Sequence, residues 1–138
     1  MKDFIESGKA TMGIEFGSTR IKAVLIDDRF RVIAQGAHDW ENRLVDGVWS
    51  YSLEAVESGL RDAYANCVAD AAAKWGAKLT RLAALGVSGM MHGYLAFDGR
   101  GELLVPFRTW RNVMTVEAAA RLSDLFGFNI PQRWSVAH

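Results

Sequence analysis

Residues 13–27 constrain the fold of this chain more than any other segment. Two apolar, strand-like runs in this segment flank a tight turn that consists of Gly17, Ser18 and Thr19. Glycine supplies unusual backbone angles in a turn, and serine and threonine bond to nearby backbone groups, so the pattern predicts a β-hairpin. A carboxylate, Glu15, stands just before the turn, and Lys22 stands just after it.

The same turn admits a second interpretation, in which it binds phosphate. A small turn with backbone N–H groups and two hydroxyls can hold phosphate oxygens. A carboxylate beside such a turn can hold Mg²⁺, usually through water. The chain lacks the Walker pattern and the Gly-x-Gly-x-x-Gly pattern that opens a helix. Local chemistry alone favours the plain hairpin, and the phosphate-binding turn stays an open alternative.

Length and composition indicate a globular protein. The chain has 138 residues, of which half are hydrophobic and five are tryptophan, so it can bury a sizeable core. Sixteen basic and sixteen acidic residues leave no formal net charge, which argues against a surface for nucleic acid or for an anionic membrane. The single cysteine, Cys67, excludes an internal disulfide and suits a reducing compartment. Residues 1–11 lack the apolar segment of a signal peptide, so we expect a cytoplasmic protein.

The order of the predicted elements indicates an α/β fold with a mixed sheet. Three short strands are expected at residues 12–16, 20–27 and 30–37. Because their connections are short, these strands are predicted to form an antiparallel meander. Residues 38–51 are expected to form an ordered aromatic loop with Gly47 in a turn. We expect Trp40 in this loop to be structural, whereas Trp49 suits either a structural or a functional role.

A long helix is predicted next, at residues 53–75, between Ser52 as N-cap and Gly76 as the C-terminal stop. Apolar side chains recur in it at helical spacing, at Val56, Leu60, Ala63, Tyr64, Cys67, Val68 and Ala71. Residues 82–87 are wholly apolar and are expected to form a strand that is buried on both faces. Because a helix connects this strand to the meander, we expect it to lie parallel to one of the meander strands.

The last third of the chain is predicted to contain a hairpin and a second helix. Residues 94–97 and 103–105 read as strands around the turn at residues 98–101, where Asp-Gly is a strong hairpin signal. A helix is expected at residues 115–125, with Thr115 as its N-cap and Gly127 after its end. Residues 128–138 carry no signal for a further element.

Two polar segments in this part of the chain are candidates for ligand binding. Residues 88–93 read Ser-Gly-Met-Met-His-Gly and directly follow the apolar strand, and strand ends are where α/β sheets bind ligands. Residues 108–112 read Arg-Thr-Trp-Arg-Asn, in which an indole can stack on a sugar while amide and guanidinium groups bond its hydroxyls. Taken alone, each segment is better explained as an ordinary turn or surface loop.

The order of these segments changes that balance. A Gly-Ser-Thr hairpin, a meander, a long helix, a strand that ends in Ser-Gly-Met-Met-His-Gly and then Trp-Arg-Asn together resemble the N-terminal domain of the FGGY carbohydrate kinases. The xylulose-kinase-like branch is the most similar. The resemblance implies a ribonuclease H-like fold of the superfamily that also contains actin and the heat-shock chaperones. It implies a mixed sheet with a three-strand antiparallel meander, one parallel strand and flanking helices.

The resemblance also implies roles for individual residues. The turn residues Gly17, Ser18 and Thr19 match the loop that faces the ATP phosphates, and Lys22 matches a lysine common in this strand. Glu15 occupies the position of an aspartate on the Mg²⁺ side. On the sugar side, the resemblance implies binding roles for Met91, His92, Trp110 and Asn112. Asn112 departs from the pattern, because xylulose kinases usually carry an aspartate there.

The largest departure from the family is length. Its members run to several hundred residues, and their catalytic aspartate and adenosine-binding domain come later in the chain. Residues 12–138 are therefore expected to form part of the N-terminal, sugar-binding domain of a longer kinase, with residues 1–11 as an extension and no catalytic residue. The implied reaction is ATP-dependent phosphorylation of a sugar, a pentulose such as xylulose, and the 138-residue chain alone is not expected to turn over.

Two other functions stay open. The chain could be a non-catalytic module that binds a sugar or a nucleotide, or an ATPase domain of the actin or chaperone type. The Met-His-Gly segment and Trp110 argue against the latter, since those proteins need no sugar pocket. Family members often dimerise, so the resemblance also admits a homodimer.

Overall fold

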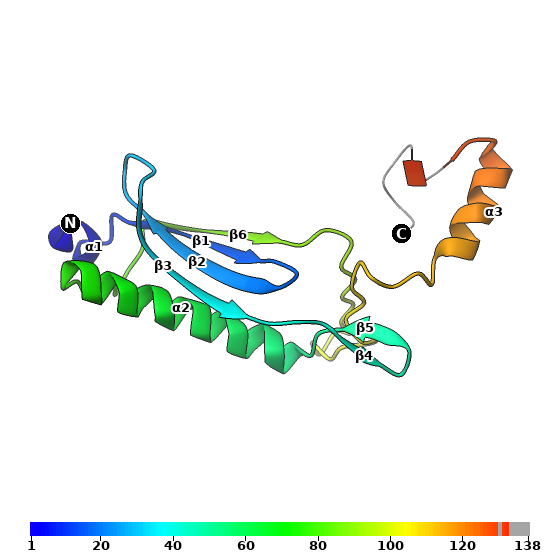
Figure 1. Ribbon diagram of the computed structural model, residues 1–138, viewed down its shortest axis with the longest axis horizontal. Coiled ribbons are helices and arrows are strands. Elements are labelled where there is room, and N and C mark those ends of the chain that lie inside the picture. The colour runs from blue at the N-terminus through cyan, green and yellow to red at the C-terminus, as the bar shows by residue number, and fades with distance from the viewer. Residues whose placement is uncertain (130, 133–138) are drawn as a thin grey trace. The chain divides into compact units, whose positions relative to one another are not determined.

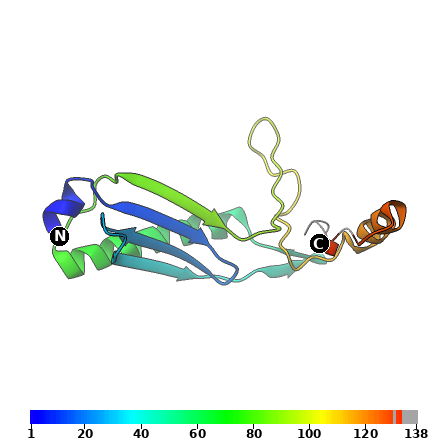
Figure 2. The same ribbon diagram turned by 90° about the horizontal axis from the view of Figure 1, so that it is seen from above.

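The computed structural model describes residues 1–129, 131 and 132. The chain forms two compact units. Unit 1 consists of Met1–Glu41 and Leu53–Met90, and unit 2 consists of Asn42–Ser52 and the described residues from Met91 onward. Figures 1 and 2 show the elements of each unit in two views.

Unit 1 is built on a four-stranded mixed sheet. Its elements are α1 (Lys2–Glu6), β1 (Thr11–Phe16), β2 (Arg20–Ile26), β3 (Val32–Asp39), α2 (Leu53–Trp75) and β6 (Ala84–Gly89). The strand order is β3-β2-β1-β6, as Figure 2 shows. The β1–β2 and β2–β3 pairs are antiparallel, and β6 is parallel to β1. The structure therefore confirms the predicted meander, the parallel strand and the bounds of the long helix.

Alternation along the strands gives the sheet of unit 1 one apolar face. Met12 and Ile14 of β1 alternate with exposed residues, and so do the buried residues of β2, which are Ile21, Ala23 and Leu25. The register pairs Met12 with Leu25 and Ile14 with Ala23, so these side chains share a face. The helix α2 packs on β2 and β3 and covers this face (Figure 1). Glu15 and Lys22 lie on the opposite face.

Small residues allow α2 to approach the sheet closely. The buried positions of the helix are Gly59, Ala63, Cys67 and Ala71, which recur every fourth residue and form one narrow stripe. On β3, Gly36 faces this stripe, and a Cβ atom there would lie 2.2 Å from the backbone nitrogen of Cys67 and 2.3 Å from the carbonyl oxygen of Ala63. Glycine is required at position 36 because only hydrogen fits between strand and helix.

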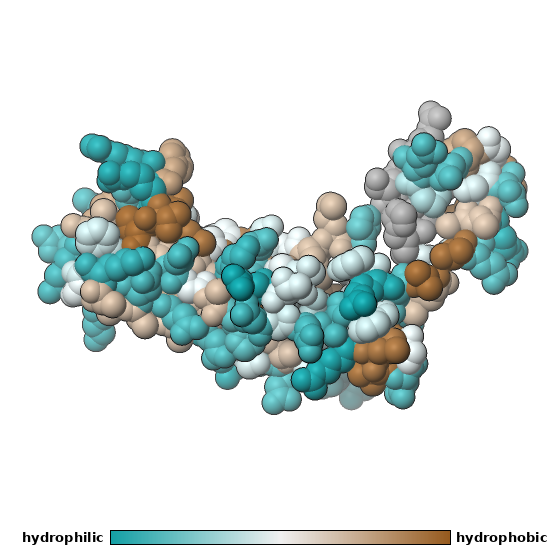
Figure 3. All heavy atoms as spheres, viewed as in Figure 1, coloured by the Kyte–Doolittle hydropathy of each residue, from teal (hydrophilic) through white to brown (hydrophobic). Residues whose placement is uncertain are grey.

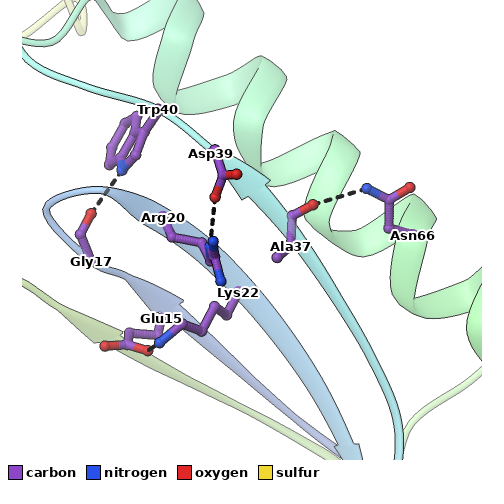
Figure 4. Close-up of polar contacts among 8 residues, drawn as sticks. All are labelled: Glu15, Gly17, Arg20, Lys22, Ala37, Asp39, Trp40 and Asn66. Carbon is purple, nitrogen blue, oxygen red and sulfur yellow. Dashed lines mark hydrogen bonds and ion pairs between the residues drawn. The ribbon is translucent and has the colours of Figure 1, made fainter.

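Polar side chains of α2 also cap the outer edge of β3. Asn66 donates to the carbonyl oxygen of Ala37 at 2.9 Å (Figure 4), and the Trp75 indole donates to Ile33 at 2.8 Å. The Asp70 carboxylate accepts from the backbone N–H of Gln35 at 2.9 Å. These bonds occupy edge groups that would otherwise be available to pair with another strand.

The last strand of the sheet, β6, differs from the prediction. The sequence predicted a strand at residues 82–87 that is buried on both faces, whereas all six residues of β6 are exposed. Leu85 and Val87 keep 56% and 66% of their surface accessible. The prediction was wrong because β6 is an edge strand and α2 packs on β2 and β3 instead. Figure 3 shows a hydrophobic patch over one end of the strands of unit 1.

The N-terminal segment contains a short helix that the sequence did not predict. In α1, Ile5 is fully buried, and the carboxylate of Glu6 accepts from the backbone N–H of Lys78 at 3.0 Å. Residues 1–11 are thus packed into unit 1. Within the described part of the chain, the helices lack the combination of length and apolarity that would span a membrane.

Unit 2 contains a hairpin where a loop was expected. The strands β4 (Arg43–Val45) and β5 (Val48–Ser50) pair antiparallel within the segment at residues 38–51. Asp46 and Gly47 connect them with positive φ angles of 49° and 78°, so the predicted turn at Gly47 is confirmed. The sequence concealed the hairpin because each strand has only three residues, too few for a periodic pattern.

The second predicted hairpin has its turn but lacks extended strands. Tyr94 bridges Arg108 and Phe97 bridges Leu103, as isolated antiparallel pairs rather than extended strands. The carboxylate of Asp98 closes the turn by accepting from the backbone N–H groups of Arg100 and Glu102, at 2.8 and 2.9 Å. The turn was therefore predicted correctly, and the strands at residues 94–97 and 103–105 were not.

The last described helix, α3, spans Val116–Phe126 and ends at Gly127, which has a positive φ of 69°. The predicted helix is confirmed to within one residue. Thr115 occupies the N-cap position but makes no side-chain cap bond, and its hydroxyl is buried without a partner among the described residues. The segment at residues 128–138, where no element was predicted, lies partly outside the described residues.

Candidate functional site

The candidate site in unit 1 lies where two parallel strands end together. In the β1–β6 pair, Glu15 is aligned with Ser88 and Phe16 with Gly89. The backbone N–H of Met90 then donates to the carbonyl oxygen of Phe16 at 3.0 Å. Ligands of α/β sheets bind at the carboxyl ends of parallel strands. The turn after β1 and the Ser-Gly-Met segment, which begins in the last two residues of β6, therefore meet at a sheet edge suited to a ligand.

The turn itself is a tight three-residue connection between β1 and β2. The backbone N–H of Gly17 donates to the carbonyl oxygen of Arg20 at 3.0 Å, which leaves Ser18 and Thr19 at the tip. A Cβ atom on Gly17 would lie 2.8 Å from that same carbonyl oxygen. The predicted hairpin is thus confirmed, and its glycine is required by space.

Trp40 follows β3 and holds this turn from one side. Its indole N–H donates to the carbonyl oxygen of Gly17 at 2.7 Å (Figure 4). Its backbone N–H donates to the carbonyl oxygen of Thr19 at 3.1 Å. Its ring lies 6.5 Å from the ring of Phe16. The expected structural role of Trp40 is confirmed. Its direct attachment to the turn was missed, because a tryptophan after a strand gives no sign of its partner.

The charged pair beside the turn is formed across the hairpin. Glu15 and Lys22 are aligned in the β1–β2 register, and the ammonium group lies 3.0 Å from the carboxylate (Figure 4). About half of each side chain is exposed, at 51% and 47%. Among the described residues, no group of three or more His, Cys, Asp or Glu side chains gathers as a metal site. Glu15 would therefore offer a metal ion one carboxylate.

In unit 2, the predicted sugar-side residues lie on two neighbouring segments. Tyr94 and Arg108 exchange backbone hydrogen bonds of 2.9 and 3.1 Å, which brings the chain after His92 alongside the chain before Trp110. His92 has a positive φ of 61°. Met91 and Trp110 are exposed, with 76% and 51% of their surface accessible.

Asn112 and Arg111 contact the β4–β5 hairpin through Trp49. The Asn112 amide oxygen accepts from the backbone N–H of Trp49 at 2.8 Å, and its NH₂ group donates to the carbonyl oxygens of Trp49 and Thr109 at 2.8 and 3.0 Å. The Arg111 guanidinium lies 3.7 Å from the centre of the Trp49 ring and donates to Asn42 at 3.0 Å. Both N–H donors of Asn112 are therefore used within unit 2.

Comparison with solved structures gives this arrangement its context. Over 86% of its length, the chain matches a xylulose kinase from Brucella ovis with a TM-score of 0.72 and 22% sequence identity. It matches a xylulose kinase from Rhodospirillum rubrum over 84% of its length (TM-score 0.68, 19% identity) and a gluconate kinase from Lactobacillus acidophilus over 86% (TM-score 0.64, 19% identity). The chain has the fold of the carbohydrate kinases.

The matched part is about a quarter of each carbohydrate kinase. The chain spans 24% of the Brucella ovis structure and 23% of each of the other two, about a quarter of their length. No protein-family model and no curated protein matches the sequence. The likeness thus confirms the ribonuclease H-like fold and the resemblance to carbohydrate kinases stated from the sequence.

One further feature of unit 2 was not predicted. A cavity of about 400 Å³ lies along α3, and its lining includes Trp110, Asn112, Val116 and Asp124. Among the described residues, Met91 and His92 do not line it. The cavity escaped prediction because it depends on how α3 packs beside Trp110, which the helical pattern does not reveal.

Proposed function

We propose that this chain is the first part of an ATP-dependent carbohydrate kinase that phosphorylates a sugar, a pentulose such as xylulose. One observation supports the proposal most directly. In a chain with the fold of carbohydrate kinases, the β1–β2 turn, Glu15 and the start of the Ser-Gly-Met segment lie at the ends of two parallel strands. In this proposal residues 12–138 are part of the sugar-binding domain, with residues 1–11 as its extension, in a cytoplasmic protein that can form homodimers.

The turn and its neighbours are proposed to serve the nucleotide. The N–H groups and hydroxyls at Gly17, Ser18 and Thr19 would contact phosphate oxygens, and Lys22 would add positive charge. Mg²⁺ usually keeps several waters and takes one or two carboxylates, so the single carboxylate of Glu15 fits it. ATP and Mg²⁺ together supply the transferred group and neutralise its charge. In the absence of the metal, Lys22 neutralises Glu15.

The exposed residues of unit 2 are proposed to serve the sugar. Trp110 would stack on apolar C–H groups of the sugar, and Met91 and His92 would contact the sugar from the neighbouring segment, which Tyr94 and Arg108 join to the segment of Trp110. Asn112 can offer only the second lone pair of its amide oxygen, because its two N–H donors are already bonded. Asn112 would therefore accept a hydroxyl proton, as the usual aspartate would.

A coupled assay of ADP release tests the proposal. We expect the 138-residue chain to release no ADP in response to sugar, since this proposal places the catalytic aspartate later in the kinase. A protein that continues the chain beyond His138 should phosphorylate a pentulose, and His92→Ala should weaken pentulose binding measured by tryptophan fluorescence. Sugar-dependent ADP release by the 138-residue chain would contradict the proposal. So would a flat fluorescence response of the longer protein to a panel of pentuloses.

One observation favours a second candidate, a non-catalytic module that binds a sugar or a nucleotide. Glu15 is paired with Lys22, and no acidic cluster accompanies it among the described residues. Such a module would bind ligand without turnover even in the longer protein. Titration with sugar and with ATP, run beside the ADP assay, separates the two candidates.

A further inference from the structure

We infer that Trp40 is a positioning residue. By binding carbonyl oxygens of the β1–β2 turn, it fixes the direction in which the backbone N–H groups of the turn point. The inference rests on the proposed function, in which this turn faces ATP phosphates. Trp40 itself would not touch the nucleotide. It would act through the backbone of Gly17 and Thr19, to which it is bonded directly.

The contacts of Trp40 reach the carbonyl oxygens on both sides of the turn tip. The indole N–H takes the oxygen of Gly17 at 2.7 Å, and the backbone N–H takes the oxygen of Thr19 at 3.1 Å. The residue before it, Asp39, forms an ion pair with Arg20 at the start of β2 (Figure 4). Asp39, the last residue of β3, and Trp40 therefore contact the turn and the start of β2 at Gly17, Thr19 and Arg20.

Because the peptide bond is planar, these contacts also determine the direction of the neighbouring backbone N–H groups. In a trans peptide the C=O and N–H groups point to opposite sides, and the structure has no cis peptide bond among its described residues. Because the Gly17 carbonyl points to Trp40, the N–H of Ser18 points away from it. By the same reasoning, the N–H of Arg20 points away from the Thr19 carbonyl that Trp40 holds.

The arrangement also removes an electrostatic obstacle. A carbonyl oxygen carries partial negative charge, and a turn whose carbonyls faced the nucleotide would repel phosphate. Trp40 binds two such oxygens, those of Gly17 and Thr19, so the N–H groups of Ser18 and Arg20 point away from it, and N–H dipoles attract anions. A flexible turn would lose conformational entropy each time it bound phosphate, which would weaken binding. Trp40 is 9% exposed and packs on Phe16, so it is itself well fixed.

The chain offers a matched control in Trp75. Its indole N–H also donates to a backbone carbonyl, that of Ile33, at 2.8 Å. Ile33 lies in β3, away from the turn at residues 17–20. Trp40→Phe and Trp75→Phe each remove one indole hydrogen bond and keep an aromatic ring. Only the first removes a bond to the turn.

The test uses steady-state kinetics of the complete kinase of which we propose this chain to be the first part. We expect Trp40→Phe to raise KM for ATP about tenfold, because the free energy of one hydrogen bond corresponds to about that change in affinity. KM for the sugar should stay unchanged. Trp75→Phe should leave both values unchanged. A general loss of stability would lower the active fraction and would not separate the two substrates.

The kinetic results separate the role of Trp40 from the proposed function. An active wild-type kinase in which Trp40→Phe leaves KM for ATP unchanged would overturn the role of Trp40 and leave the proposed function standing. A complete wild-type protein with no ATP-dependent activity would overturn both.

A second measurement covers a Trp40→Phe variant that fails to fold. The indole N–H resonance of Trp40 in the wild-type protein should shift on saturation with ATP, while that of Trp75 stays in place. An unmoved Trp40 resonance in an active kinase would also overturn the inference.

Discussion

Asn112 and Trp49 exchange two hydrogen bonds of 2.8 Å each, between an amide side chain and a backbone N–H and C=O. The amide thereby pairs with β5 as a residue of a neighbouring strand would. Thr109 adds its backbone N–H to the same Trp49 carbonyl at 3.1 Å. This pairing attaches the segment that carries Trp110 to the β4–β5 hairpin of unit 2.

Asn112→Asp is therefore expected to loosen this attachment. A carboxylate only accepts hydrogen bonds, so the bonds to the carbonyl oxygens of Trp49 and Thr109 are lost and oxygen faces oxygen. Amide hydrogen exchange at Trp49 and Thr109 should accelerate at least tenfold, equivalent to about 1.4 kcal/mol or more of local stability.

Asn129→Asp is the matched control for that substitution. The side-chain oxygen of Asn129 accepts from the backbone N–H of Gln132 at 2.8 Å, a role that a carboxylate can also perform. Exchange at Trp49 and Thr109 should stay at the wild-type rate in this variant. Equal protection of Trp49 in both variants would show that the Asn112 amide does not hold the hairpin.

Gly36→Ala should strongly destabilise unit 1. The added methyl group would overlap the α2 backbone, since a Cβ atom at this position lies 2.2 Å from the nitrogen of Cys67. The helix must move away from β3, and we expect a loss of about 3 kcal/mol in the free energy of unfolding measured in urea. Gly86→Ala in β6, where no atom lies within 4 Å of the added Cβ, should change it little. Similar losses in both variants would refute the close approach.

The stability of unit 1 should fall in acid because of Asp27. Its buried carboxylate accepts from the backbone N–H groups of Arg29 and Arg31, and the Arg31 guanidinium forms an ion pair with it at 2.7 Å. The hydrogen bond from the Arg31 side chain is the main cause that lowers the pKa of Asp27 below its ordinary value of 3.8, against the opposing effect of burial. The stabilisation is therefore complete above pH 3.8 and is lost as the pH falls through the lower pKa of the folded state.

Thermal unfolding between pH 5 and pH 2 measures this effect. The difference in Tm between the wild type and Asp27→Asn should be largest near pH 5 and should shrink toward pH 2. Asp28→Asn, at an exposed neighbouring position, should leave the pH profile of the wild type in place. A Tm difference for Asp27→Asn that stays constant over this range would contradict the role of the ion pair.

Cys67 should be inert in the folded protein. The thiol is fully buried under β3, and burial, aided by the charge of Asp70, raises its pKa to about 11. The thiolate is the reactive form, and little of it exists at pH 8. A thiol reagent at pH 8 should modify Cys67 only when denaturant is added. Rapid modification in buffer would place Cys67 outside the core.

Sequence reasoning succeeded where a local pattern is sufficient. The meander follows from short runs of β-branched residues, and the bounds of α2 follow from Ser52, Gly76 and the apolar spacing between them. The parallel pairing of β6 follows from the helix that connects it to the meander. Order along the chain was also enough to reveal the resemblance to carbohydrate kinases, whose fold the structure shares.

The prediction failed where burial and partners depend on residues far apart in the chain. An apolar strand reads the same whether it is central or at an edge, so the exposure of Leu85 and Val87 could not be foreseen. The β4–β5 hairpin is too short for a pattern, and it is hydrogen-bonded to Asn112, 63 residues away from Trp49.

The sequence by itself determined that Gly17, Ser18 and Thr19 form a turn between two strands, because turn chemistry is local. Only the tertiary structure decided which residue binds the carbonyl oxygens of that turn. Trp40 lies 23 residues from Gly17, and its bond to the Gly17 carbonyl depends on where β3 ends beside β2. The physical reason is that turn formation depends on neighbouring residues, whereas the group that binds the Gly17 carbonyl is a side chain distant in the sequence.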